Sequence, residues 1–155
     1  MGTTIHTVPV QAILPLRHRI LRAGLPIETV HCAGDNDTST LHFAVFDGNT
    51  VIACATLLQR DLDEQHAYQL RCMAVTEERQ RTGIGGALLR HINRHVVANS
   101  VTDLLWCNAR LHAASFYTRH GWQIISDPFN IPDVGPHVRM IRRLASPSAD
   151  DSCTA

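Results

Sequence analysis

A run of glycines between an expected strand and an expected helix constrains this chain more than any other segment. The run is Gln80-Arg81-Thr82-Gly83-Ile84-Gly85-Gly86, called the glycine loop below, and three of its last four residues are glycine. Glycine inside a helix costs about 1 kcal/mol relative to alanine, so glycines at a helix start need a compensating reason. A tight turn that lets the helix pack on a sheet is one such reason, and close approach of the backbone to a ligand is another.

The helix that begins at the glycine loop is a candidate site for a phosphate-bearing ligand. Its first N–H groups are unpaired and carry a partial positive charge, which suits a pyrophosphate, and Arg79 and Arg81 add cationic donors. A P-loop would place lysine and a hydroxyl residue where Ala87-Leu88 stands. A dinucleotide fingerprint needs glycine in place of Leu88 and an acidic residue after the next strand, whereas Asp103 precedes that strand. The glycine loop therefore fits neither of these nucleotide sites.

Length, charge and hydropathy limit the class of protein. The 155 residues fit one domain over residues 1–145, followed by a small, polar tail at 146–155 that is expected to be disordered. Basic and acidic residues balance at 14 each, so no net charge favours nucleic acid or an anionic membrane. The longest apolar run, Val51 to Leu58, is too short to cross a bilayer, and the N-terminus lacks a signal-peptide pattern. We expect a cytoplasmic protein without nucleic-acid or membrane partners.

The cysteines and histidines indicate neither a disulfide framework nor a metal centre. Three of the five cysteines lie in apolar runs, where cysteine packs as a small hydrophobe, and no C-x-x-C pair or metal-ligand spacing occurs. His91 and His95 are four residues apart on an expected helix, without the glutamate of a zinc-protease motif. We interpret them as polar residues on a solvated helix face, and we expect no metal. The cysteines are Cys32, Cys54, Cys72, Cys107 and Cys153.

Hydrophobic periodicity predicts an α/β chain with alternating groups of strands and helices. Turn residues after Phe46 predict a β-hairpin, and Gly121 is typical of a helix C-terminus. The segment between the last two strands holds three prolines and is expected to be a loop. The expected strands are residues 4–10, 41–46, 50–58, 67–75, 104–107, 122–125 and 137–144, and the expected helices are residues 13–21, 84–96 and 113–117.

Three segments together resemble the GNAT superfamily of N-acetyltransferases. Gln80-x-x-Gly83-x-Gly85 matches the family signature Q/R-x-x-G-x-G/A, and the strand before it is similar to the family's fourth strand. Asn108, then Ala113-Ala114-x-Phe116-Tyr117, then Gly121-Trp122 resembles the second cofactor segment of the family. Residues 129–140 are similar to the C-terminus of many bacterial members of unassigned substrate, and the resemblance covers residues 5–144.

The resemblance implies the GNAT fold, which is an α/β (α+β) fold. Its sheet is mixed and mostly antiparallel, has about six to seven strands splayed between the fourth and fifth, and is flanked by helices. Other members have a second helix after the first, whereas residues 25–40 hold at most a short turn here. This difference concerns the acceptor pocket rather than the cofactor site.

The resemblance also implies an N-acetyltransferase that moves the acetyl group of acetyl-CoA to a primary amine of a small molecule or peptide by direct attack in a ternary complex. Backbone groups of residues 73–75 would bind the pantetheine arm, with the Val75 N–H facing the oxyanion, and the glycine loop would hold the pyrophosphate. Asn108 would bond amide groups of the arm. The implied cofactor-binding residues are Met73, Ala74, Val75, Gln80, Arg81, Thr82, Gly83, Ile84, Gly85, Gly86, Asn108, Ala114 and Phe116.

Two residues are expected to transfer protons. Tyr117 is the expected general acid for the departing thiolate, because a phenol of pKa about 10 can share its proton with a thiolate whose conjugate acid has a pKa of about 8.5. A core aromatic is the alternative role for Tyr117. His137 is the preferred general base, because the Gly-Pro turn before it places it at the mouth of the last strand. A histidine that bonds a backbone carbonyl is its alternative role, and other base candidates are Glu64, Glu28, His66 and His31.

Two other functions are compatible with the same residues. A non-catalytic acyl-CoA-binding module would use the same glycine loop, and a structural or interaction protein would bind no small ligand. The expected partner of the enzyme is a small-molecule amine acceptor, and a second copy of the chain, forming a homodimer, is a further candidate. Four arginines, either solvated or able to steer an acidic acceptor, are Arg17, Arg19, Arg22 and Arg71.

Overall fold

The computed structural model describes residues 2–100 and 102–144, and these residues form two compact units. The first unit comprises residues 2–59 and 70–92, and the second comprises residues 60–69, 93–100 and 102–144. The expected tail at 146–155 lies outside the described residues. The strands are β1 Thr3–Val8, β2 Leu41–Asp47, β3 Thr50–Gln59, β4 Tyr68–Val75, β5 Leu104–Arg110, β6 Gln123–Ile124, β7 Phe129–Ile131 and β8 Gly135–Arg143. The α-helices are α1 Leu14–Leu21, α2 Ile84–Asn99 and α3 Ala114–Arg119, and the 3-10 turns are η1 Val10–Ala12, η2 Ile27–Val30, η3 Glu77–Arg79 and η4 Leu111–Ala113.

The architecture confirms the expected mixed α/β fold. The described residues form an open sheet of eight strands, in which β4 and β5 are parallel and the other described pairs are antiparallel. Only the short turn η2 lies between α1 and β2, as expected from residues 25–40.

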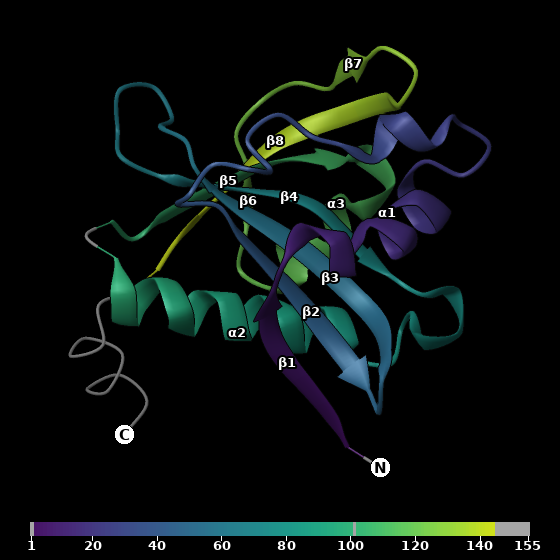
Figure 1. Ribbon diagram of the computed structural model, residues 1–155. Coiled ribbons are helices and arrows are strands. Elements are labelled where there is room, and N and C mark those ends of the chain that lie inside the picture. The colour runs from purple at the N-terminus through teal and green to yellow at the C-terminus, as the bar shows by residue number, and fades with distance from the viewer. Residues whose placement is uncertain (1, 101, 145–155) are drawn as a thin grey trace. The chain divides into compact units, whose positions relative to one another are not determined.

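Helices cover both faces of the sheet in the first unit. The strands β1, β2 and β3 lie side by side and antiparallel (Figure 1). Ile13 and Leu16 pack with Ala44 of β2 in one buried cluster. Neighbouring strand residues point to opposite faces, and the ring of Phe43 contacts the ring of His91 on α2, with 5.8 Å between centroids. His91 is therefore half-buried against an aromatic ring, which corrects the expectation of a solvated face.

A buried ion pair joins α1 to the segment before β2. Arg17 is 1% exposed and donates to Asp35 Oδ2 at 2.8 Å, to the Val30 carbonyl at 2.8 Å and to Thr56 Oγ1 at 2.8 Å. His42 lies 2.8 Å from the same hydroxyl and 3.0 Å from the Asp35 carbonyl. Arg17 is thus a structural residue of the interior and not a solvated or steering arginine.

The partners of Asp35 decide its charge state. Burial raises the pKa of this carboxyl, but the hydrogen bond and charge of Arg17 and the hydrogen bond from the Cys32 N–H outweigh burial and lower the pKa below 3.8. The folded state therefore holds Asp35 ionised more firmly than the unfolded chain does.

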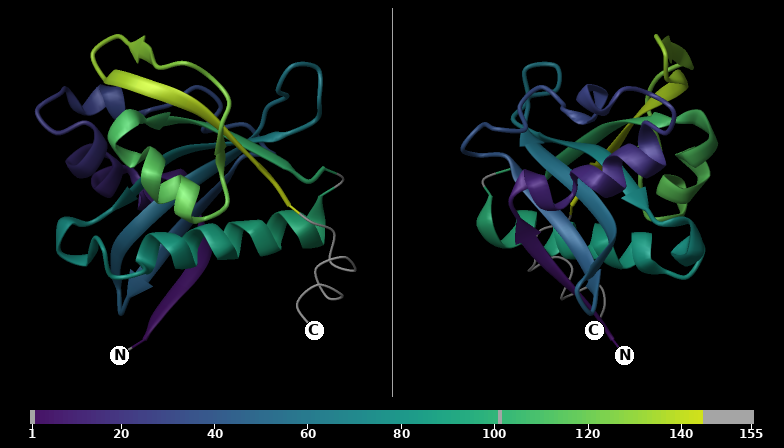
Figure 2. Two further views of the ribbon diagram at one scale, coloured as in Figure 1. Left: turned by 180° about the vertical axis from the view of Figure 1, so that it is seen from behind. Right: turned by 45° about the vertical axis from the view of Figure 1, so that its right-hand side comes forward.

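The second unit is organised around β8. Tyr68 and Gln69 of β4 pair in parallel with Leu105 and Trp106 of β5, and β5 runs antiparallel to β8. The strands β6 and β7 pair with different parts of β8, and Figure 2 shows β7 folded back along it. A small core forms from Leu62, Ala67, Leu104 and Trp106, with Ile141 packed against it.

Two strands of the second unit, β5 and β7, depart most from the sequence-based expectation. The strand β5 continues to Arg110, because its last three residues complete the pairing with β8. The strand β7 forms where a loop was expected, between Pro128 and Pro132. Proline is tolerated next to a short strand that pairs on one side only. The prolines therefore suggested a loop in the sequence, although they are compatible with the strand β7.

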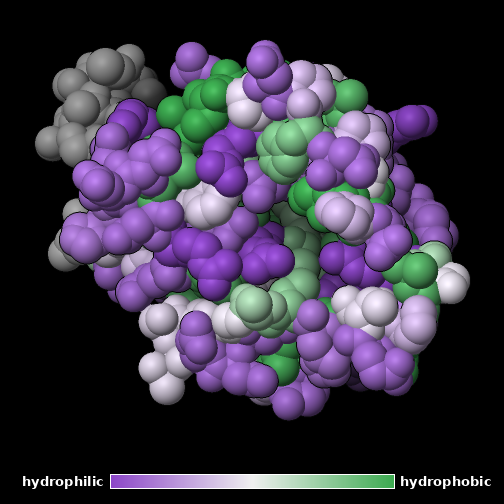
Figure 3. Space-filling model, turned by 90° about the horizontal axis from the view of Figure 1, so that it is seen from above, coloured by the Kyte–Doolittle hydropathy of each residue, from purple (hydrophilic) through white to green (hydrophobic). Residues whose placement is uncertain are grey.

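One face of the molecule shows little large-scale apolar character. The face drawn in Figure 3 is mostly hydrophilic, and hydrophobic side chains occur there in small separate patches. In the part of the chain that is described, no helix is both long and apolar enough to span a membrane.

We predict that Asp35→Ala lowers the free energy of unfolding by about 3–5 kcal/mol, because it leaves the Arg17 charge buried without its carboxylate. Urea denaturation at neutral pH measures this loss. The matched control is Asp47→Ala, which removes a partly exposed pair with Arg79 (39% and 32% exposed) and should cost at most about 1 kcal/mol. A carboxyl whose pKa is lower in the folded protein than in the unfolded chain stabilises the fold when the pH is above its unfolded pKa. The stability lost in Asp35→Ala should therefore shrink as the pH falls below 3.8. Equal losses in the two variants would contradict the prediction.

Candidate active site

The glycine loop joins β4 to α2 through left-handed backbone at Arg81 and Gly83, whose φ angles are +64° and +90°. The Ala87 N–H donates to the Gly83 carbonyl at 3.0 Å, so the N–H groups of residues 84–86 precede the hydrogen-bonded ladder of the helix. A Cβ added at Gly83 would meet nothing within 4 Å, so the φ angle rather than crowding favours glycine there. The open space and the N–H groups of the loop fit a pyrophosphate at this helix start.

Gln80 braces the glycine loop against the strand before it. Its Nε2 donates to the Val75 carbonyl at 2.9 Å, and the hydroxyl of Thr82 donates to the Arg79 carbonyl. At the same place the Thr76 N–H donates to the Ile52 carbonyl at 2.8 Å. The signature glutamine therefore positions the loop, and its side-chain amide is already used within the protein.

The basic residues around the glycine loop have different roles. Arg79 was expected to add a donor for the ligand, but its guanidinium lies 2.6 Å from the Asp47 carboxylate. Arg19 likewise donates to the Thr76 hydroxyl at 2.7 Å. Arg81 is exposed on the loop itself. Of the two arginines expected beside the pyrophosphate, Arg81 is the better placed.

The second half of β4 contains a backbone irregularity that sequence analysis missed. Cys72 has φ +55°, a left-handed conformation that disfavours residues with a Cβ. It directly precedes Met73, Ala74 and Val75, of which Ala74 is buried and the other two are half-buried. No glycine or proline marks this position, so the sequence carried no signal for it.

Asn108 is held by an arginine that sequence analysis did not single out. Its Oδ1 accepts from Arg139 Nε at 3.1 Å, and the Arg139 guanidinium lies 4.8 Å from the centroid of the Trp106 ring. Arg139 stands opposite Asn108 in the β5–β8 register. Only the strand pairing reveals this neighbour, because the two residues are 31 positions apart.

Tyr117 is fixed by aromatic packing on α3. It is 8% exposed, and its ring centroid lies 5.2 Å from that of Phe116 and 5.4 Å from that of Trp122. Ala114 is buried at the start of the same helix. The packing holds the ring in one orientation, which is consistent with both the core role and the general-acid role.

His137 makes the carbonyl contact that was its alternative role. Its Nδ1 lies 2.7 Å from the Gly135 carbonyl, and its ring stacks on Phe129 with 6.1 Å between centroids. Because a carbonyl only accepts hydrogen bonds, the neutral form of this imidazole carries its proton at Nδ1 and keeps its lone pair at Nε2. The contact therefore fixes the tautomer that a base at Nε2 requires, although the residue is only 4% exposed.

The other base candidates lie at the surface. Glu64 occupies an exposed turn with φ +69°, and Glu28 is exposed in η2. His31 is exposed, and His66 Nδ1 lies 3.3 Å from Asp61 Oδ1. Within the described residues, no three His, Cys, Asp or Glu side chains group closely enough to hold a metal ion.

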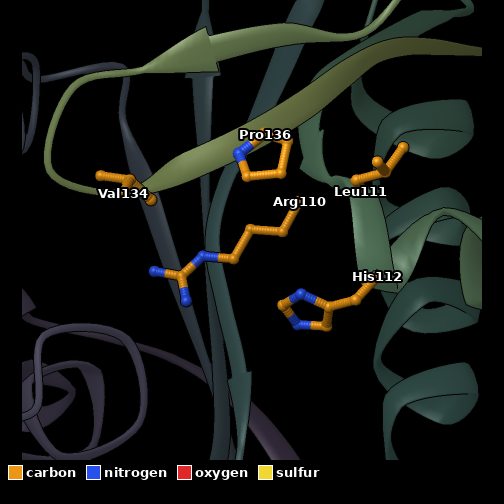
Figure 4. Close-up of a pocket in the computed structure, with 5 residues that line it drawn as sticks. All are labelled: Arg110, Leu111, His112, Val134 and Pro136. Atoms are coloured by element: carbon orange, nitrogen blue, oxygen red, sulfur yellow. The ribbon is translucent and has the colours of Figure 1, made fainter.

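A pocket of about 300 Å³ lies beside the end of β5 in the second unit. Figure 4 shows the side chains of Arg110 and His112 extending the same way below the β7–β8 turn. Sequence analysis missed this pocket because its lining brings the end of β5 and η4 together with the β7–β8 turn and the start of β8, which are far apart in the sequence. The lining residues are Arg110, Leu111, His112, Val134 and Pro136.

Comparison with known proteins agrees with the fold. Residues 38–124 match the family described as the acetyltransferase (GNAT) domain. The chain is 34% identical over 143 residues to YitI, an uncharacterised N-acetyltransferase of Bacillus subtilis, covering 90% of this chain and 95% of YitI.

Two solved structures show the same fold. The ribosomal-protein-S18-alanine N-acetyltransferase of Escherichia coli superposes with a TM-score of 0.72 at 21% identity, covering 93% of this chain and 95% of that one. A GNAT family acetyltransferase from Elizabethkingia anophelis with acetyl-CoA bound superposes with a TM-score of 0.65 at 18% identity, covering 92% and 98%. Because the family match spans more than half of the chain and YitI aligns with nearly all of it, this protein belongs to the GNAT family and is an acetyltransferase.

Proposed function

We propose that this enzyme transfers the acetyl group of acetyl-CoA to a primary amine of a small molecule or peptide, with both substrates bound together. The observation that carries the proposal is the glycine loop, an open left-handed turn at the start of α2. The acetyl-CoA bound to the Elizabethkingia protein and the N-acetyltransferase names of the other relatives support the donor and the amine class.

The glycine loop and the end of β4 are the proposed donor site. Main-chain N–H groups of residues 81–86 and the positive end of α2 bind the pyrophosphate, and Arg81 adds an exposed cation. Gln80 acts indirectly by holding the loop on Val75. Main-chain groups of residues 73–75 bind the pantetheine arm. The family resemblance further implies that Asn108, Ala114 and Phe116 contact the cofactor.

The proposed chemistry uses three groups of this chain. Acetyl-CoA supplies an acetyl group that is already activated as a thioester. The Val75 N–H stabilises negative charge at the acetyl oxygen, as one such donor is worth about 3 kcal/mol in other enzymes. The Tyr117 hydroxyl gives its proton to the departing sulfur. His137 accepts a proton at Nε2 while Nδ1 stays on the Gly135 carbonyl, which helps because a lysine-like amine is neutral about once in 10³ molecules at pH 7.

We predict that Gly83→Ala weakens acetyl-CoA binding by at least about tenfold, because alanine disfavours φ +90° and would turn the loop N–H groups away. Isothermal titration calorimetry measures the affinity. The matched control is Gly48→Ala in the β2–β3 turn, where φ is +63° and the space is equally open, and it should bind like the wild type. No uptake of acetyl-CoA by the wild type at millimolar concentration would overturn the proposed donor site.

We predict that Tyr117→Phe lowers kcat by roughly ten- to a thousand-fold with little change in the Kd of acetyl-CoA, because only proton donation is lost. Thiol release is measured with the amine that turns over fastest in a screen of amino acids, polyamines and protein N-termini. Tyr68→Phe removes the other tyrosine hydroxyl of the chain and should leave kcat unchanged. Unchanged kcat in Tyr117→Phe would end the assignment of the acid.

We predict that His137→Ala lowers kcat/KM and abolishes the acid limb of its pH profile, because a general base acts only when it is deprotonated. Glu64→Gln should keep the limb. Circular dichroism at each pH checks that both variants stay folded. A wild-type acid limb in His137→Ala would exclude His137 as the base.

A further inference from the structure

Two cysteines of the first unit are in contact although they are 40 residues apart. Cys32 follows η2 and Cys72 lies in β4, and their Sγ atoms are 2.9 Å apart. Both are free thiols and both are half-buried, so part of each residue is accessible to solvent. A disulfide has an S–S length of about 2.05 Å, so the two atoms need to approach by only about 0.9 Å to become bonded.

Charges and hydrogen bonds around Cys32 favour its thiolate. The Cys72 thiol bonds to the Cys32 sulfur and is the main cause that lowers the pKa of Cys32 from 9.0 to about 6. Burial raises this pKa, the charges of Arg17 and Arg71 lower it further, and the charge of Asp35 raises it. The same hydrogen bond, together with burial, raises the pKa of Cys72 well above 9.0, so Cys72 is the thiol partner.

The remaining described cysteines lack this combination. Cys54 and Cys107 are buried, and burial raises the pKa of each to about 12. Cys153 lies outside the described residues. Among the cysteines that the structure describes, only the pair of Cys32 and Cys72 combines a favoured thiolate, a thiol in contact with it and partial exposure to solvent.

We propose that Cys32 and Cys72 are a hydroperoxide-reactive thiol pair, with Cys32 the attacking sulfur and Cys72 the resolving sulfur, which closes to an intramolecular disulfide. This proposal does not rest on the proposed donor site.

The reaction balances in two steps. The Cys32 thiolate attacks one oxygen of hydrogen peroxide, the O–O bond breaks, and the leaving hydroxide takes a proton from solvent, which gives a sulfenic acid and water. The Cys72 sulfur then attacks the Cys32 sulfur, the S–O bond breaks, and hydroxide leaves as water with the Cys72 proton. The two sulfurs lose two electrons in total, and one hydrogen peroxide is reduced to two molecules of water.

The expected rate advantage of Cys32 is moderate. At pH 7 a thiol of pKa about 6 is roughly 90% thiolate, whereas one of pKa 9.0 is roughly 1% thiolate. The weaker basicity lowers the nucleophilicity by about 15- to 30-fold for a Brønsted slope of 0.4–0.5, so the net gain in attack is about three- to sixfold. Cys32 differs more from an isolated cysteine in the second step, because its resolving thiol, Cys72, is already in contact with it.

We predict that the reduced full chain, treated with one equivalent of hydrogen peroxide at pH 7, loses two of its five thiols and yields a cross-linked Cys32–Cys72 peptide. Thiol counting after denaturation and peptide mass mapping without reduction measure both quantities on the wild type, so the main test needs no variant. Dithiothreitol should restore the two thiols. A map in which Cys32 and Cys72 stay reduced or pair elsewhere would overturn the proposal.

Variants separate the roles of the two sulfurs. Cys72→Ser should stop at the sulfenic acid, which dimedone captures at Cys32, and Cys32→Ser should form the adduct at Cys72 more slowly than Cys72→Ser forms it at Cys32. The controls are Cys107→Ser, which removes a buried thiol, and Cys153→Ser, and both should form the disulfide at the wild-type rate. Equal reactivity of Cys72 in the absence of Cys32 would contradict the assignment of the attacking sulfur.

Discussion

The ion pair between Arg17 and Asp35 is the interaction on which the first unit depends most. Two charges leave water, which is costly, and the arrangement is tolerable because each partner is bonded several times. Arg17 binds a carboxylate, a carbonyl and a hydroxyl, while the Asp35 carboxylate also accepts the Cys32 N–H at 2.9 Å. This charged contact thereby joins three parts of the first unit, which are α1, the segment that follows η2, and β3.

The same carboxylate links the stability of the fold to the thiol pair. By accepting the Cys32 N–H, Asp35 holds the backbone that carries the attacking sulfur, yet its negative charge opposes the thiolate. The balance favours the thiolate because the hydrogen bond from Cys72 and the two guanidinium charges outweigh both burial and the charge of Asp35. The structural salt bridge between Arg17 and Asp35 therefore also influences the reactivity of the neighbouring Cys32 sulfur. The Arg17 charge lowers the pKa of Cys32 although Arg17 is buried and paired with Asp35.

The sequence predicts local features well and long-range contacts poorly. The element order and the glycine loop were predictable, because periodicity and glycine preference act within a few residues. The pairs Arg17–Asp35, Asn108–Arg139 and Cys32–Cys72 were not, because each depends on which strands and loops become neighbours. Similarly, β7 exists only because β8 offers it a partner. The wrong expectations therefore concentrate at buried polar side chains, because the residue type alone predicts that an arginine is exposed.

The backbone at Cys72 supports a use for its sulfur. A non-glycine residue with φ +55° is strained by roughly 1–2 kcal/mol and persists only where its surroundings hold it. Glycine would relieve this strain at the same position, but it would remove the sulfur that contacts Cys32. Alanine would keep the strain without the contact. A strained cysteine in contact with a second thiol is consistent with the proposed use of its sulfur, and the same left-handed backbone also directs the chain into residues 73–75 of the proposed donor site.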